Sequence, residues 1–267
     1  MYRYDAMDLQ PRLGVAVHLI FNCVRLGGLI PIVVITTMAP VRASTIIQFN
    51  TVIGTIDVRL YDTATPITIA NFLNYTNSGR YNGTFIHRSA ETQFGEDFVI
   101  QGGGFILNNS IFAATPIQTD PPIQNEPGIS NVRGTIAMAK LGGDPNSATS
   151  QWFINLGDNS FLDLTANNAF TVFGRVLGNG MDVVDAIAAL DRINAGYSPF
   201  TEVPVLNQEV VLAQGDIRDT DSVNVNSVTL LAIPDGDYDF DSDVDGADFL
   251  QWQIDLGSTV QAAADGN

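Results

Sequence analysis

Cysteine, histidine and basic residues are all scarce in this chain of 267 residues. One cysteine cannot form a disulfide framework or a multi-cysteine zinc or iron–sulfur site, and two histidines are too few for a histidine-rich metal site. Only 12 Lys and Arg stand against 29 Asp and Glu, which gives a formal net charge of −17. The chain therefore lacks the basic surface with which general nucleic-acid binders neutralise phosphates, so we expect no nucleic-acid partner.

The charge is unevenly distributed along a chain that is otherwise typical of a folded protein, with 45% apolar and 15% charged residues. Residues 1–43 contain four Arg and two acidic residues, and residues 44–215 contain seven basic and 15 acidic residues. Residues 216–267 contain one Arg and 12 acidic residues. The last fifth of the chain thus carries most of the net negative charge, which predicts a separate acidic module.

The N-terminal region has the features of an export signal. Three arginines precede an apolar run over residues 26–38, and Ala43 ends the kind of small-residue site that signal peptidase cleaves. We therefore predict that residues 1–43 are a signal peptide and that the protein is exported to the periplasm, the extracellular space or the cell surface. The alternative is an uncleaved anchor, but the run is shorter than the ~20 residues of a membrane span. Cleavage after Ala43 leaves no membrane span and no cysteine.

Short β-branched runs separated by Gly- and Asn-rich turns follow from Ser44 onward. Residues 45–61 predict two strands with a turn at Asn50 and Thr51. Further strands are predicted at residues 83–87, 98–101, 134–139, 152–155, 171–176 and 208–213. Many short strands of this kind are typical of a β-barrel or a sandwich, and a closed barrel leaves no open sheet edge.

Two helices interrupt the strand pattern. Thr65 is suited to cap the first helix and Pro66 to occupy its first position, and the helix is predicted to end near Asn77. The second helix is predicted over residues 181–190, where apolar residues recur at helical spacing.

Six strings occur in this order: YNGTFIHR at 81–88, FVIQGGGF at 98–105, NVRGTIAMA at 131–139, SATSQWFI at 147–154, NSFLD at 159–163 and FTVFGRV at 170–176. Together they resemble the cyclophilin family of peptidyl-prolyl isomerases, and most closely its bacterial periplasmic type. The resemblance implies a mainly β fold for residues 44–215, a closed eight-stranded antiparallel barrel capped by two α-helices. Residues 216–234 are then expected to be a linker.

The resemblance also implies which residues act. Arg88 falls on the family's catalytic arginine, with Phe98 and Gln101 beside it, and Gln101 is expected to hold Arg88 and the substrate carbonyl. The expected substrate-binding residues are Ala139, Lys140, Gln151, Phe153, Phe161, Leu162 and Phe170. Two of these depart from the common pattern, because many members have Trp in place of Phe161 and His in place of Phe170. We therefore expect Phe161 to weaken binding of cyclosporin-type inhibitors. Phe170 leaves the substrate preference open.

The chemistry of proline isomerisation fits these residue types. Rotation about a peptide bond faces a barrier of about 18–20 kcal/mol, because resonance gives the C–N bond double-bond character. No covalent bond is broken, so the reaction needs no nucleophile, no general base and no cofactor. A guanidinium donates to the prolyl nitrogen only when resonance is lost, which stabilises the twisted transition state selectively. The expected partners are therefore proline-containing polypeptides.

Two alternatives remain open from the residues alone. Arg88 could be a surface arginine paired with Glu91 or Glu96, and the phenylalanines could be ordinary barrel core. The whole domain could also be a non-catalytic module of cyclophilin fold that binds proline peptides and is anchored through its acidic tail.

The acidic tail contains a candidate calcium loop at residues 237–248, DYDFDSDVDGAD. Its carboxylates follow the ligand spacing of an EF-hand, in which oxygen atoms bind Ca²⁺. The candidate ligands are Asp237, Asp239, Asp241, Asp243, Asp245 and Asp248. Asp at the last position resembles a dockerin repeat, so residues 235–267 are interpreted as a truncated dockerin-like repeat with a cohesin-like partner. The alternative is a solvated acidic tail that binds no metal.

Overall fold

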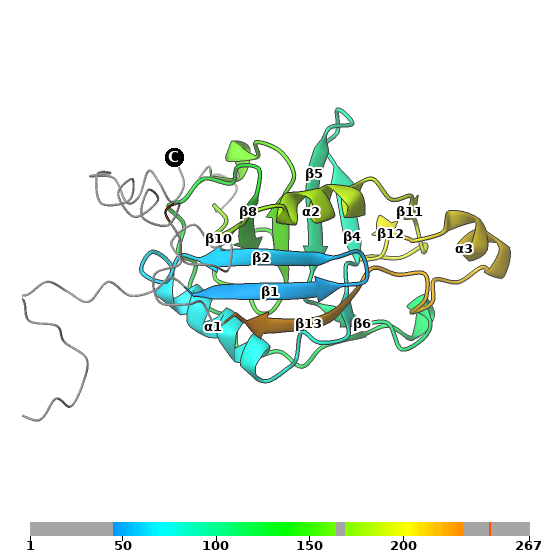
Figure 1. Ribbon diagram of the computed structural model, residues 1–267, viewed down its shortest axis with the longest axis horizontal. Coiled ribbons are helices and arrows are strands. Elements are labelled where there is room, and N and C mark those ends of the chain that lie inside the picture. The colour runs from blue at the N-terminus through cyan, green and yellow to red at the C-terminus, as the bar shows by residue number, and fades with distance from the viewer. Residues whose placement is uncertain (1–44, 164–168, 232–245, 247–267) are drawn as a thin grey trace, which may run out of the picture. The chain divides into compact units, whose positions relative to one another are not determined.

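The computed structural model describes residues 45–163 and 169–231, together with Gly246 (Figure 1). A strongly curled antiparallel sheet dominates these residues, with the strand order β4-β5-β9-β8-β10-β2-β1-β13-β3-β6-β7. Its strands are β1 Ile46–Thr51, β2 Thr55–Leu60, β3 Thr84–Phe85, β4 Arg88–Glu91, β5 Asp97–Gly102, β6 Phe105–Ile106, β7 Thr115–Pro116, β8 Thr135–Met138, β9 Trp152–Asn155, β10 Val172–Val176 and β13 Asn224–Leu230. A separate two-stranded sheet pairs β11 Arg192–Ile193 with β12 Val203–Pro204.

The antiparallel β architecture agrees with the sequence prediction. The described residues place eleven strands in the main sheet, whereas the prediction was a closed barrel of eight. Only Ile86 and His87 separate β3 from β4, although these two strands stand far apart in the strand order. Closure into an eight-stranded barrel stays a prediction.

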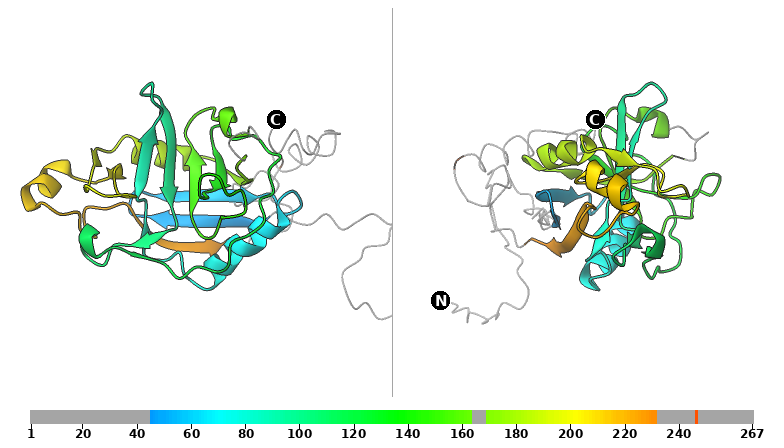
Figure 2. Two further views of the ribbon diagram at one scale, coloured as in Figure 1. Left: turned by 180° about the vertical axis from the view of Figure 1, so that it is seen from behind. Right: turned by 90° about the vertical axis from the view of Figure 1, so that its right-hand side faces the viewer.

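The structure contains three α-helices among the described residues, α1 Pro66–Asn77, α2 Gly180–Ala188 and α3 Gln208–Gln214, and two 3-10 helices, η1 Ile111–Ala113 and η2 Ser160–Asp163. In Figures 1 and 2, α1 lies beside β13 and α2 lies beside β2, and both pairs are in contact. The first two helices match the predicted ones.

The predicted cap of α1 was wrong. The Thr65 side chain makes no capping hydrogen bond. Instead the Glu126 carboxylate accepts from the backbone N–H groups of Ile67 and Thr68, at 3.1 and 2.8 Å, and from the Thr68 hydroxyl at 2.8 Å. A carboxylate from a distant loop thus satisfies the free donors of the first turn and complements the positive end of the helix dipole.

Two further predictions need correction. Residues 208–213 form α3 and no strand, because the Asn207 side chain accepts from the Val210 N–H at the start and Gly215 ends the helix with a left-handed φ of 70°. Residues 216–234 are not all linker, because β13 lies in the main sheet between β1 and β3. Val225 and Val228 are buried in the core and anchor this strand.

The main core lies between the curled sheet and the helices and is built on aromatic rings, including Phe49, Phe72, Trp152 and Phe173. No helix among the described residues is long and apolar enough to cross a membrane. The predicted signal peptide, residues 1–43, and the predicted calcium loop, residues 237–248 apart from Gly246, lie outside the described residues.

Candidate active site

Adjacent strands bring two of the predicted catalytic residues and one predicted substrate-binding residue into one row across the sheet. Arg88 on β4 lies opposite Gln101 on β5, and Gln101 lies opposite Phe153 on β9. Phe153 in turn lies opposite Ala137 on β8. Directly opposite residues of antiparallel strands share a face, so these side chains are neighbours although they are far apart in the sequence.

Arg88 is held by an acidic residue that the sequence analysis did not identify. Its Nε donates to a carboxylate oxygen of Glu202 at 2.9 Å, and the Ser89 N–H donates to the Glu202 carbonyl at 2.8 Å. The predicted alternative partner Glu91 pairs with Arg192 instead. Among the described residues, the two terminal nitrogens of the Arg88 guanidinium have no hydrogen-bond partner, and about a third of the side chain is exposed. The guanidinium is therefore oriented but still able to donate.

Gln101 has a different contact from the one predicted. Its amide nitrogen donates to the side-chain oxygen of Gln151 at 2.8 Å, and it makes no hydrogen bond to Arg88. Arg88 is instead held through Nε by Glu202, the residue before β12. The predicted pair of glutamines thus forms a polar bridge next to the arginine.

An apolar cluster lies beside this row. Phe153 and Leu162 are among its buried members, and Phe98, Ala139 and Phe170 are among the residues partly buried against it. The Phe153 and Phe170 rings meet edge to face at 5.6 Å, a favoured aromatic geometry. This cluster gathers four of the residues predicted for substrate binding, together with Phe98 from the predicted catalytic set.

The two remaining predicted residues stand at the edges of the cluster. The Phe161 ring stacks on Phe98 with the centroids 5.7 Å apart, and the Phe161 side chain is 45% exposed. The Lys140 ammonium lies 4.2 Å from the centroid of the Phe170 ring, a cation–π contact, and burial lowers its pKa. The residues predicted for catalysis and substrate binding therefore lie in one region of the described structure.

His87, next to Arg88, is fully buried among the rings of Phe85, Phe105 and Phe200. Burial lowers its pKa to about 4, because the apolar surroundings disfavour the charged imidazolium. The ring is therefore neutral at pH 7 and serves the packing of this strand.

A groove of about 880 Å³ opens next to the row and shares Arg88, Phe98 and Phe161 with it. Its outer wall is the tip of the β4–β5 hairpin, which includes Phe94. The sequence analysis missed both the hairpin and Glu202. Glu202 stands in no recognised motif, and its contact with Arg88 spans 114 residues.

The sequence profile of the family described as "Cyclophilin type peptidyl-prolyl cis-trans isomerase/CLD" matches residues 46–210. This chain belongs to the cyclophilin family. It is 43% identical over 191 residues to a peptidyl-prolyl cis-trans isomerase of Acinetobacter baylyi, covering 71% of this chain and 92% of that protein. It is 44% identical over 179 residues to the isomerase cyp18 of Streptomyces antibioticus, covering 64% of this chain and 97% of that protein.

A third relative, peptidyl-prolyl cis-trans isomerase B of Escherichia coli, is 40% identical over 155 residues, covering 56% of this chain and 88% of that protein. The family match lies within residues 46–210 and so includes the whole row of predicted site residues. It ends well before the acidic tail, so the calcium and dockerin interpretations stay predictions.

Proposed function

We propose that this cyclophilin catalyses rotation about X–Pro peptide bonds, with Arg88 as its catalytic residue. The observation that carries the proposal is an oriented guanidinium with free terminal donors beside a buried apolar cluster. The names of the relatives favour catalysis over the alternative of a non-catalytic proline-binding module.

The proline ring binds against the apolar cluster, with Phe153 and Leu162 at its base and Phe98 at its side. Removing the ring from water contributes about 25 cal/mol per Å² of buried apolar surface. Binding there holds the proline while the chain before it rotates. Gln101 and Gln151, bonded to each other, present the remaining amide groups to the substrate backbone.

Arg88 acts on the transition state. In the planar amide the prolyl nitrogen shares its lone pair with the carbonyl and accepts hydrogen bonds poorly. As the bond twists, the nitrogen becomes pyramidal and recovers the lone pair, and a terminal N–H of Arg88 donates to it. The hydrogen bond is stronger in the transition state than in either ground state, which is the condition for acceleration.

The direct test is an isomerisation assay on a proline peptide with wild type, Arg88→Ala and a control, Arg175→Ala, which removes an exposed arginine elsewhere on the sheet. We expect Arg88→Ala to lower kcat/KM by about 10²–10³-fold, the usual effect of removing a transition-state donor, and Arg175→Ala to change it little. Equal rates for Arg88→Ala and wild type would disprove the catalytic assignment.

Export and calcium binding are separate proposals from the sequence. We propose that residues 1–43 direct export and that residues 237–248 bind Ca²⁺, supported by the signal-like pattern and by the spacing of the carboxylates. A dockerin-like tail would place the isomerase on a cohesin-like partner. Calorimetry of the full chain with Ca²⁺, compared with a double variant Asp239→Asn and Asp241→Asn, tests the metal site; equal heats for both would remove it.

A further inference from the structure

The hairpin that joins β4 and β5 extends away from the rest of the sheet (Figures 1 and 2). Its turn is tightly bonded: the Thr92 N–H donates to the Glu96 carbonyl at 2.7 Å, and the Gly95 N–H donates to the Thr92 carbonyl at 3.0 Å. The Thr92 hydroxyl oxygen also accepts from the N–H groups of Phe94 and Glu96. A fixed turn therefore presents Phe94, which is 81% exposed.

The groove between this hairpin and residues 156–161 is continuous with the proposed active site. Arg88 and Phe98 line both, and the stacked ring of Phe161 adds an aromatic surface. A groove of about 880 Å³ is about 10 Å across, the length of about three extended residues. A polypeptide with its proline on the apolar cluster thus places a neighbouring residue in the groove.

The charged side chains that line the groove are mainly acidic. The side chains that line it include four acidic residues and one cation, Arg88. That cation is already bonded to Glu202, and one of the four acids is paired with Arg192. The other three, Glu96, Asp97 and Asp158, are exposed and form no ion pair within the described residues. Carboxylates next to exposed aromatic rings complement a long cationic side chain, which the rings attract through their faces.

We propose that this groove is a second subsite of the enzyme, which binds a Lys or Arg side chain within about three residues of the substrate proline. The proposal rests on the proposed isomerase function and narrows its substrates to basic proline-containing segments. The methylene chain lies against Phe94 and Phe161, and the charged end lies near Glu96, Asp97 and Asp158.

The test uses peptides in which one residue next to the proline is Lys, Glu or norleucine. This residue is placed first on one side of the proline and then on the other. We expect the kcat/KM of wild type for the Lys peptide to exceed that for the Glu peptide by about tenfold on one side of the proline, mainly through KM. The ratio should shrink at 0.5 M salt, because exposed charges are screened within about 4 Å at that ionic strength.

The decisive variant is Glu96→Gln/Asp97→Asn/Asp158→Asn, which removes the unpaired carboxylates. We expect it to bring the Lys-to-Glu ratio close to one, with the rate of each peptide expressed relative to that of the norleucine peptide on the same variant. The matched control, Asp182→Asn/Glu209→Gln, removes exposed carboxylates on α2 and α3 and should leave the preference intact. Phe94→Ala should weaken turnover of the Lys peptide by about threefold, as expected for losing one exposed cation–π contact.

A wild type that turns over all three peptides equally, or a preference that survives in the triple variant, would overturn the subsite. The isomerase proposal fails differently, through absence of turnover for every peptide. In that case calorimetric binding of the Lys and Glu peptides to the same variants still decides the subsite.

Discussion

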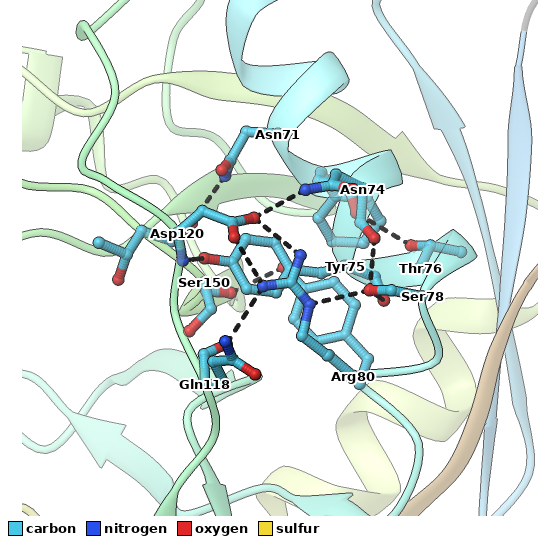
Figure 3. Close-up of polar contacts among 12 residues, drawn as sticks. Asn71, Asn74, Tyr75, Thr76, Ser78, Arg80, Gln118, Asp120 and Ser150 are labelled. Atoms are coloured by element: carbon cyan, nitrogen blue, oxygen red, sulfur yellow. Dashed lines mark hydrogen bonds and ion pairs between the residues drawn. The ribbon is translucent and has the colours of Figure 1, made fainter.

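Two ion-paired arginines on the same domain show opposite uses of one side chain. Arg80, after α1, uses all three nitrogens of its guanidinium (Figure 3): Nε donates to Ser78 at 2.8 Å, Nη1 to the Gln118 carbonyl and to Asp120, and Nη2 to Asp120 at 2.7 Å. Its guanidinium carbon also lies 4.0 Å from the centroid of the Tyr75 ring. Arg88 is bonded to its carboxylate through Nε alone.

The difference separates a structural arginine from the arginine that we propose to be catalytic. The Arg80 region is nearly closed, because four of the five N–H groups of the guanidinium are bonded within the described residues. The Tyr75 hydroxyl also accepts from the Asp120 N–H at 2.7 Å, so a loop and a helix are joined. The hydrogen bonds from Arg80 lower the pKa of Asp120. An ion pair by itself therefore says little about function; the number of unused donors on the guanidinium says more.

Replacing each arginine by lysine should give the largest difference in activity between the Arg80 and Arg88 sites. Lysine keeps the positive charge but not the planar set of donors. We expect Arg88→Lys to lower kcat/KM by about 10²-fold, because one transition-state donor is lost, with little change in the free energy of unfolding. Arg80→Lys should leave kcat/KM unchanged. A loss of activity of similar size in both variants would mean that the donor count does not distinguish the sites.

The two regions should lose stability at different acid pH values, because His87 and Asp120 titrate in different pH ranges. The folded state keeps His87 neutral with a pKa near 4, whereas the unfolded chain binds a proton near pH 6.5. The contribution of His87 is therefore complete above pH 6.5 and falls by about 3 kcal/mol as the pH drops from 6.5 to 4. The lowered pKa of Asp120 puts the loss of its contribution below pH 3.8, its unperturbed value.

The measurement is urea unfolding of wild type and His87→Gln between pH 7.5 and 4. The variant cannot titrate at this position, so its free energy of unfolding should depend less on pH than that of wild type over this range. Parallel curves would show that His87 does not stay neutral in the folded protein.

Replacing Arg80 by alanine should affect stability and not activity. Arg80→Ala deletes its bonds to Ser78 and Asp120 and should lower the free energy of unfolding by about 1–2 kcal/mol. Isomerase activity at 25 °C should stay within about twofold of wild type, because the bonded atoms lie outside the proposed site. Urea denaturation and the peptide assay on the same preparation check both, with Arg175→Ala as the reference.

The smallest effect is expected for the carboxylate of Glu202, which orients the arginine that we propose to be catalytic. Glu202→Gln weakens a half-exposed ion pair and should lower kcat by about two- to fivefold with KM little changed. Glu202→Asp should recover part of the loss, which a purely structural role for this residue would not predict. A full wild-type kcat in Glu202→Gln would show that Arg88 needs no such partner.

Local patterns predicted much of this fold. Pro66 marked the first turn of α1, and the strings around Gln101 and Phe153 fell on paired strands. The row of site residues was predictable because each member stands in a string typical of the family. A residue whose role depends on its neighbours in the sequence can therefore be predicted from the local motif.

Long-range partners were not predictable. Glu126 caps α1 from 58 residues away, and Glu202 reaches Arg88 from 114 residues away, so no local pattern reports either contact. The error at α3 has another cause, because two adjacent valines favour a strand while Asn207 and Gly215 favour helix ends. There the capping residues were more informative than β propensity.

The position of β13 has a consequence for how the chain is made. Ile47 on β1 pairs with Leu230 on β13, so the first strand to be synthesised waits for the last one. At about 5–20 residues per second, the roughly 180 residues between them take on the order of 10–35 seconds to synthesise. During that time one edge of β1 has no partner and is open to pairing with other chains. The cyclophilin domain thus passes through a period in which this strand edge is exposed, and that period ends only when residue 230 has emerged.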